Sequence, residues 1–227
     1  MQNRFSLTQP KTGSKKVTIV YSGGDDLFVV GAWNEVIEAA VDLRNAFSKY
    51  TDGALTFSAG IGLFEQGYPI SRMAYEVQKL ESAAKGIDDK KNAISIFGAE
   101  LEKDKPSFKH TYKWDVFLNH IVEEKLRLIQ KFFDSQSDEE RAKGNSFLYK
   151  LMDYIIKSEE KINIARCAYL LGRMAPSSDA PAEVKNTYSQ FSKSLYDWIL
   201  KPDDRKQLLT AINIYVYLNR DNKKEEK

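Results

Sequence analysis

Two glycines followed by two aspartates are the residues of this chain best suited to carry out chemistry. Gly23 and Gly24 carry no side chain, so a phosphate-bearing ligand can approach the backbone there. Asp25 and Asp26 add two hard oxygen ligands, and Mg²⁺ prefers one or two carboxylates together with substrate phosphates. The same residue types are ordinary turn formers, so the tetrapeptide alone supports a plain turn at least equally well.

The segments on either side of these four residues favour the functional interpretation. Residues 17–21 (VTIVY) and 27–32 (LFVVGA) are apolar, β-branched and aromatic, which predicts a hairpin with a tight glycine turn. Their hydrophobicity is nearly continuous, as in strands that are central in a sheet or covered on both faces. Such strands would desolvate the two carboxylates, and a ligand or metal would have to offset that cost.

The remaining elements predict an α+β half followed by an all-α half. After the hairpin, hydrophobic spacing predicts a helix over 35–50 capped by Asn34, a strand over 55–64 containing Gly60 and Gly62, a helix from Pro69 to about 85, and a strand over 92–97. Interior strand glycines often mark a bulge or a close backbone approach. Beyond the linker the pattern is purely helical, near 112–133, 144–157, 160–174, 182–200 and 204–219, with breakers at Gly144, Pro176, Pro181 and Pro202.

The domain organisation follows from this change of pattern. We expect a polar N-terminal segment over 1–16, an α+β domain over 17–98, a linker over 99–110, a helical domain over 111–219 and a charged tail over 220–227.

Composition excludes several classes of protein. Lys and Arg number 34 against 32 Asp and Glu, a net charge of +2, which gives no general case for a nucleic-acid or membrane-surface protein. The single cysteine, Cys167, rules out a disulfide framework and a cysteine-cluster zinc site, and the two histidines argue against a histidine-rich metal site. No apolar run approaches the roughly 18 residues of a membrane span, and the N-terminus has no apolar signal core, so we expect a cytoplasmic protein.

The hairpin belongs to an ordered series of motifs that resembles a known family. VTIVYSGGDDLFVVGAW at 17–33 resembles the catalytic hairpin of the palm (nucleotide-cyclase, GGDEF-like) superfamily. Within that superfamily the chain is most similar to the large signature subunit of type III-A CRISPR effector complexes. The similarity continues through LTFSAGIGLF at 55–64, KNAI at 91–94, KWD at 113–115, SFLYK at 146–150 and AYLLGR at 168–173, and covers roughly residues 15–219.

This resemblance implies a ferredoxin-like palm, present as β-hairpin-α-β-α-β, followed by a helical bundle. It implies a subunit that converts ATP into cyclic oligoadenylate second messengers when its complex holds target RNA, as part of antiviral defence. Asp25 and Asp26 would be the catalytic carboxylates and the ligands of Mg²⁺ or Mn²⁺. The nucleotide would be bordered by Ser22, Gly23 and Gly24, with Lys85 and Lys91 near the triphosphate; for the two lysines a solvated helix end is the alternative.

The resemblance also implies parts that the chain lacks. A palm of this type begins with a central strand that supplies a further metal-binding acid, and no candidate strand precedes residue 17. We therefore expect a chain that is catalytically incomplete alone and is completed by an upstream palm and nuclease portion, in cis or as a separate chain. Its other expected partners are CRISPR effector subunits and, through the complex, guide and target RNA. Two alternatives remain open: a non-catalytic scaffold with an incomplete palm, and a GGDEF-like synthase of a guanosine cyclic dinucleotide.

Overall fold

The computed structural model describes residues 15–97, 110–134 and 138–222. Its contacts divide the chain into two compact units, the first ending at Phe117 and the second beginning at Leu118. Each unit is described by itself. The first unit therefore extends past residue 111, where we expected the helical domain to begin. Most of the expected linker and of the polar N-terminal and charged C-terminal segments lies outside the described residues.

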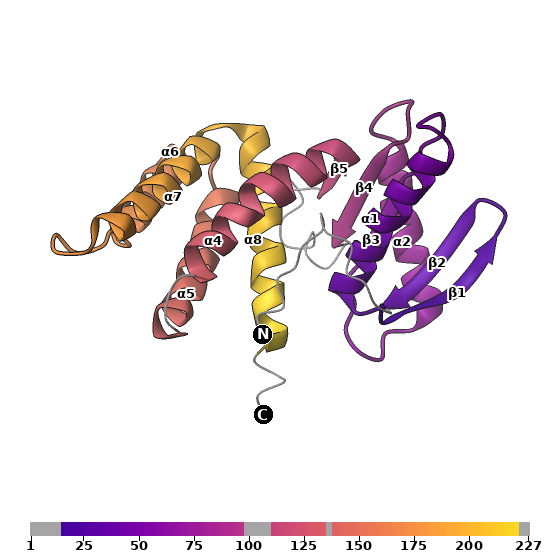
Figure 1. Cartoon of the computed structure of the whole chain (residues 1–227), viewed down its shortest axis with the longest axis horizontal. Coiled ribbons are helices and arrows are strands. Elements are labelled where there is room, and N and C mark those ends of the chain that lie inside the picture. Colours follow the sequence, from indigo (N-terminus) through magenta and orange to yellow (C-terminus); the bar gives the residue numbers. More distant parts are fainter. Residues whose placement is uncertain (1–14, 98–109, 135–137, 223–227) are drawn as a thin grey trace. The chain divides into compact units, whose positions relative to one another are not determined.

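The predicted hairpin is confirmed. Strands β1 (Val17–Gly23) and β2 (Asp26–Gly31) pair antiparallel and form a sheet of their own (Figure 1). The register runs from the pair Val17 and Gly31 to the pair Gly23 and Asp26, with an irregularity between Ile19 and Tyr21. The hairpin thus brings the glycines and the aspartates together at its tip.

A second sheet has three strands in the order β3-β4-β5. Strands β3 (Ala59–Gly62) and β4 (Ala93–Phe97) are parallel, and β5 (Thr111–Lys113) adds to β4 antiparallel. Every residue of β4 is buried, as expected for the central strand. Within the described residues no backbone ladder joins this sheet to the hairpin. The strand expected over 55–64 is confined to Ala59–Gly62, and just before it the Phe57 carbonyl accepts a hydrogen bond from the Trp114 indole at 3.1 Å.

Strand β5 corrects the prediction of a helix from about residue 112. Thr111 pairs with Ser95 of β4, and their hydroxyls lie 2.9 Å apart. Ile96 also donates its N–H to the carbonyl of His110 at 3.0 Å. Residues 111–113 are therefore a strand because they hydrogen-bond to the edge of β4, and a pattern of three residues in the sequence does not reveal that partner.

Two helices pack on the sheets of the first unit, α1 (Trp33–Tyr50) and α2 (Ile70–Lys85). Both helices were predicted, but the expected Asn34 cap is wrong: the N-cap is Ala32, which makes no side-chain capping bond. Helix α2 lies so close to β3 that a Cβ at Gly60 would be 2.4 Å from the Val77 carbonyl oxygen. This confirms the close backbone approach expected of Gly60.

The second unit is helical, as predicted. A π-helical segment η1 (Val116–Leu126) continues into α4 (Arg127–Asp134), and the chain then forms α5 (Asp138–Ile156), α6 (Lys161–Gly172), α7 (Ala182–Leu200) and α8 (Pro202–Asn222) (Figure 1). Two expected breakers lie inside helices. Gly144 is within α5, where a Cβ would come within 2.5 Å of the Phe133 ring. Pro202 opens α8, a position where its missing N–H costs nothing.

The core of this unit is aromatic. Phe132 stacks on Phe191 with ring centroids 3.8 Å apart and planes at 4°. Phe133 meets Phe191 edge to face at 5.7 Å and lies 5.7 Å from Tyr215. These rings come from α4, α7 and α8, so the cluster ties three helices together.

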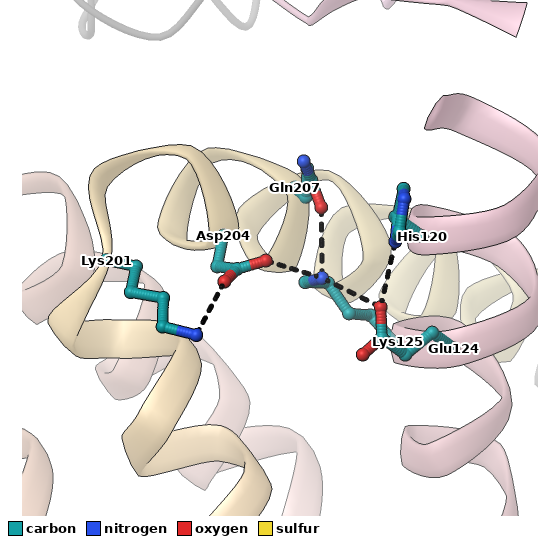
Figure 2. Close-up of polar contacts among 6 residues, drawn as sticks. All are labelled: His120, Glu124, Lys125, Lys201, Asp204 and Gln207. Atoms are coloured by element: carbon teal, nitrogen blue, oxygen red, sulfur yellow. Dashed lines mark hydrogen bonds and ion pairs between the residues drawn. The ribbon is translucent and has the colours of Figure 1, made fainter. Parts of the chain in front are cut away.

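A buried cation lies in the same unit. Figure 2 shows Lys125 of η1 pointing toward the start of α8, where its ammonium lies 3.0 Å from an oxygen of Asp204 and 2.9 Å from one of Gln207. Glu124 is 3.3 Å away and also meets His120, and the ammonium lies 4.8 Å from the centre of the Trp198 ring. Lys125 is fully buried, so these partners replace its water shell. None of the described helices is both long and apolar enough to span a bilayer.

Candidate active site

The hairpin tip is a two-residue loop formed by Gly24 and Asp25. Gly24 has a φ of +62°, whereas Asp25 is not among the described residues with positive φ. A positive φ at only the first loop residue is the pattern of a type II′ turn, whose first position favours glycine. Next to it, a Cβ at Gly23 would lie 2.6 Å from the Tyr21 hydroxyl. The two glycines thus have different roles: Gly24 permits the turn, and Gly23 leaves room beside the Tyr21 ring.

Both carboxylates at this tip are exposed to solvent. The expected desolvation is therefore not observed, because the hairpin around them is open and Tyr21 and Leu27 are exposed as well. In the described part of the chain neither carboxylate makes a hydrogen bond or an ion pair. Among those residues no group of three or more His, Cys, Asp and Glu side chains gathers into a metal site. Two open, adjacent carboxylates nevertheless fit Mg²⁺, which commonly takes its other ligands from water and substrate phosphates.

Lys85, at the end of α2, is a cation on which the negative charges of this tip act. Its ammonium forms an ion pair with Glu81 at 2.6 Å. The pKa of Lys85 is raised, first by the hydrogen bond to Glu81 and further by the negative charges of Asp26 and Asp25. Residues some sixty positions apart in the sequence therefore act on one another electrostatically. Glu81 has no role in the sequence-based site, although its i,i+4 spacing to Lys85 is the usual spacing of a helical ion pair.

The two other residues expected at the site, Ser22 and Lys91, make no contact with the carboxylates of the tip among the described residues. Ser22 is exposed in β1 and pairs with Leu27 of β2, one pair further from the loop than Gly23 and Asp26. Lys91 lies just before β4 with a φ of +48°, where its N–H bonds the Asp88 carbonyl at 3.2 Å and its carbonyl accepts the Ser58 hydroxyl at 2.7 Å. These contacts hold Lys91 beside β4, and none of them reaches the hairpin.

Comparison with known protein families first defines the class of each unit. Residues 1–95 match the family described as Cas10/Cmr2, second palm domain. Residues 130–221 match the second helical domain of the Cmr2 subunit of the CRISPR RNA silencing complex. The chain thus combines a palm domain with a helical domain, both from the large subunit of a CRISPR effector complex, a system of antiviral defence.

Individual relatives narrow this class. The chain is 42% identical over 212 residues to a protein of Mycobacterium tuberculosis, covering 93% of this chain and 24% of the relative. It is 39% identical over 206 residues to one of Streptococcus thermophilus, covering 89% and 25%. Both relatives carry the name CRISPR system single-strand-specific deoxyribonuclease Cas10/Csm1 (subtype III-A).

The chain belongs to the Cas10/Csm1 family of subtype III-A and corresponds to its second palm domain and helical domain. It spans about a quarter of the length of the curated relatives that it matches. The resemblance inferred from the sequence is thereby confirmed.

Proposed function

We propose that this chain supplies the catalytic carboxylates of a nucleotidyl-transfer site that converts ATP into cyclic oligoadenylate when its CRISPR effector complex holds target RNA. One observation carries the proposal. Asp25 and Asp26 stand exposed on a glycine turn, without partners among the described residues, and within electrostatic reach of Lys85. This arrangement suits a triphosphate substrate with its metal better than it suits a structural turn, which does not need the lysine.

The residues of the hairpin and of α2 have separate roles in this proposal. Asp25 and Asp26 would hold Mg²⁺ or Mn²⁺, and the metal would neutralise phosphate charge and favour ionisation of the attacking hydroxyl. Gly23 and Gly24 let the nucleotide approach the backbone, and the Ser22 hydroxyl borders it. Lys85 places a positive charge beside the phosphates, which compete with Glu81 for its ammonium. Lys91 contributes only if the bound triphosphate extends toward β4.

Completion of the site by another segment is part of the same proposal. Within the described residues β2 pairs only with β1, and β3 pairs only with β4. A further strand, supplied by an upstream palm portion in cis or as a separate chain, would pair with these edges and add the metal-binding acid that two carboxylates lack. Other CRISPR subunits, with the guide and target RNA, complete the assembly.

Two alternatives compete with nucleotidyl transfer to ATP. A non-catalytic scaffold does not require an intact pair of carboxylates, so the preserved Asp25 and Asp26 argue against it. A GGDEF-like synthase of guanosine cyclic dinucleotides shares the hairpin, but it has no use for the helical unit that follows here. The relatives are named for deoxyribonuclease activity, whereas the chemistry of this hairpin favours nucleotidyl transfer as the contribution of this part of the subunit.

The test replaces both carboxylates in the complete subunit within a reconstituted complex. Asp25→Ala with Asp26→Ala should abolish conversion of ATP to cyclic oligoadenylate, measured by mass spectrometry, while target-RNA binding stays intact. Asp197→Ala, which removes an exposed carboxylate from α7, is the matched control and should leave product formation unchanged. Unchanged oligoadenylate from the double variant would disprove the catalytic role. A product from GTP but not from ATP would favour the dinucleotide synthase.

A further inference from the structure

A groove runs between the antiparallel helices α5 and α6, and none of the residues that line it belongs to the hairpin site. It has a volume of about 360 Å³ and lies wholly within the second unit. The lining residues recur every three or four positions along each helix, so they lie on one face of it. They are Tyr149, Lys150, Asp153 and Tyr154 of α5, with Arg166, Tyr169, Leu170 and Arg173 on or just after α6. Every one of these residues lies in the described part of the chain.

Positive charge dominates the groove. Three cationic side chains line it, and its one carboxylate, Asp153, is already paired with Lys157 at 2.9 Å. Lys150 and Arg173 are exposed and have no ion-pair partner among the described residues. Among the residues that the structure describes, Arg166 donates only to the neutral Asn163 side chain, at 2.9 Å. Because the whole chain is nearly neutral, with a net charge of +2, this cluster is a local excess that attracts an anionic partner.

Aromatic rings lie among these charges. Tyr169 is 69% exposed, which is unusual for a large ring on a helix that has an apolar core to pack against. The Arg166 guanidinium lies 6.0 Å from the centre of the Tyr154 ring, at the other end of the groove. Exposed rings interleaved with cations form the stacking surface of proteins that bind single-stranded nucleic acid without strong sequence preference.

We propose that the α5–α6 groove binds a short single-stranded nucleic-acid segment. Bases stack on Tyr169 and Tyr154, and the backbone phosphates lie on Lys150 and Arg173. An acidic peptide would satisfy the cations equally well, but its carboxylates offer a smaller and non-aromatic surface to an exposed tyrosine ring than a nucleobase does. The rings therefore favour nucleobases over carboxylate side chains.

The experiment measures binding of a fluorescent oligouridine of about 12 nucleotides to the full chain by anisotropy. Tyr169→Ala should weaken binding about 5- to 100-fold, the loss expected for one stacked base. Lys150→Ala and Arg173→Ala should each make the dependence of log affinity on log salt shallower by about 0.7. Matched controls outside the groove are Tyr196→Ala and Lys193→Ala on α7, which should leave affinity unchanged. All five side chains are exposed, so the variants should fold, and their thermal melts verify this.

Further binding measurements identify the chemical class of the ligand. Oligothymidine of equal length shows whether the groove distinguishes RNA from DNA. Binding of either single strand more tightly than a duplex of the same length supports the proposal. Equal affinity of the groove and control variants would overturn it. So would displacement of oligouridine by polyglutamate at comparable charge concentration, since that result assigns the groove to an acidic protein segment. Equally tight binding of a duplex would exclude base stacking.

Discussion

The two units of this chain bury their aromatic and apolar side chains to very different degrees. In the second unit the stacked rings of Phe132 and Phe191 are buried where α4 packs against α7. In the first unit the hairpin leaves Ile19 and Tyr21 62% and 56% exposed, although its sequence is that of an interior strand. A helix forms its backbone hydrogen bonds within itself, so it needs only another apolar surface to pack against. A strand also needs neighbouring strands on both edges to accept and donate its backbone hydrogen bonds. The hairpin therefore has the composition of a buried element without the neighbours that would bury it.

The sharpest test of this contrast separates the two units. Residues 118–222 expressed alone should melt cooperatively with strongly helical circular dichroism, because their core is formed within the unit. Residues 15–117 alone should melt broadly and aggregate through the exposed hairpin. Analytical ultracentrifugation checks both fragments. A monodisperse, cooperatively folded first unit would remove the contrast.

The next largest effect is expected at the buried lysine of the second unit. Lys125→Ala should lower the free energy of unfolding by about 2 to 4 kcal/mol, because it leaves Asp204 and Gln207 without the ammonium that bonds them. Urea denaturation measures the change. Lys157→Ala is the matched control: its pair with Asp153 is exposed, at 60% and 50%, so its loss should cost at most about 0.5 kcal/mol. Equal costs for both variants would mean that the buried network adds nothing to stability.

Glycine substitutions compare the packing of the units directly. Gly60→Ala should destabilise the first unit by about 1 to 3 kcal/mol, because the new methyl group meets the backbone of α2 at Val77. Gly172→Ala, at the end of α6, meets no atom within 4 Å and should stabilise the second unit by up to about 1 kcal/mol. Thermal melts of the full chain report both shifts, and a neutral Gly60→Ala would show that α2 can move away from β3.

The smallest effect concerns an exposed ion pair that links the loop before β4 to β5. Asp88 and Lys113 are 2.7 Å apart, and this hydrogen bond lowers the pKa of Asp88 and raises that of Lys113. The stability from Asp88 is therefore present above its unfolded pKa and lost as pH falls below about 4. Asp88→Asn should lower the melting temperature slightly at neutral pH and leave it unchanged in strong acid. If the two melting temperatures still differ in strong acid, the asparagine side chain causes the effect and the loss of the ion pair does not.

Local sequence patterns predicted most of the elements and the tip of the site. The hairpin, α2 and the later helices follow from hydrophobic spacing and from Gly and Pro positions, which act over a few residues. What the patterns missed depends on contacts between distant segments. Strand β5 pairs with an edge that β4 offers, and Gly144 lies inside α5, where the Phe133 ring leaves no room for a side chain. Lys125 looks like any solvated lysine on a helix until α8 covers it.

The site residues divide in the same way. Gly23, Gly24, Asp25 and Asp26 are adjacent in the chain, so one motif predicts their position on a turn. Lys85 was expected only through family resemblance, since its distance from the hairpin depends on how α2 packs on β3. Glu81, its partner at 2.6 Å, was not predicted at all. The carboxylates of this site thus follow from sequence, and the cation beside them follows from packing.

The close packing at Gly60 also has a mechanical consequence. At Gly60 the backbone of α2 packs directly on β3, so sliding of the helix over the strand is sterically opposed there, and Lys85 lies on the same helix. Asp25 and Asp26 belong to the other sheet, and α1 is the described element that packs against both sheets. The separation between the ammonium and the carboxylates therefore depends on how the hairpin and the second sheet are arranged within the first unit. In the assembly proposed above, a strand that pairs with the edges of β2 and β3 would set that separation, so completing the sheet would also align the charged groups.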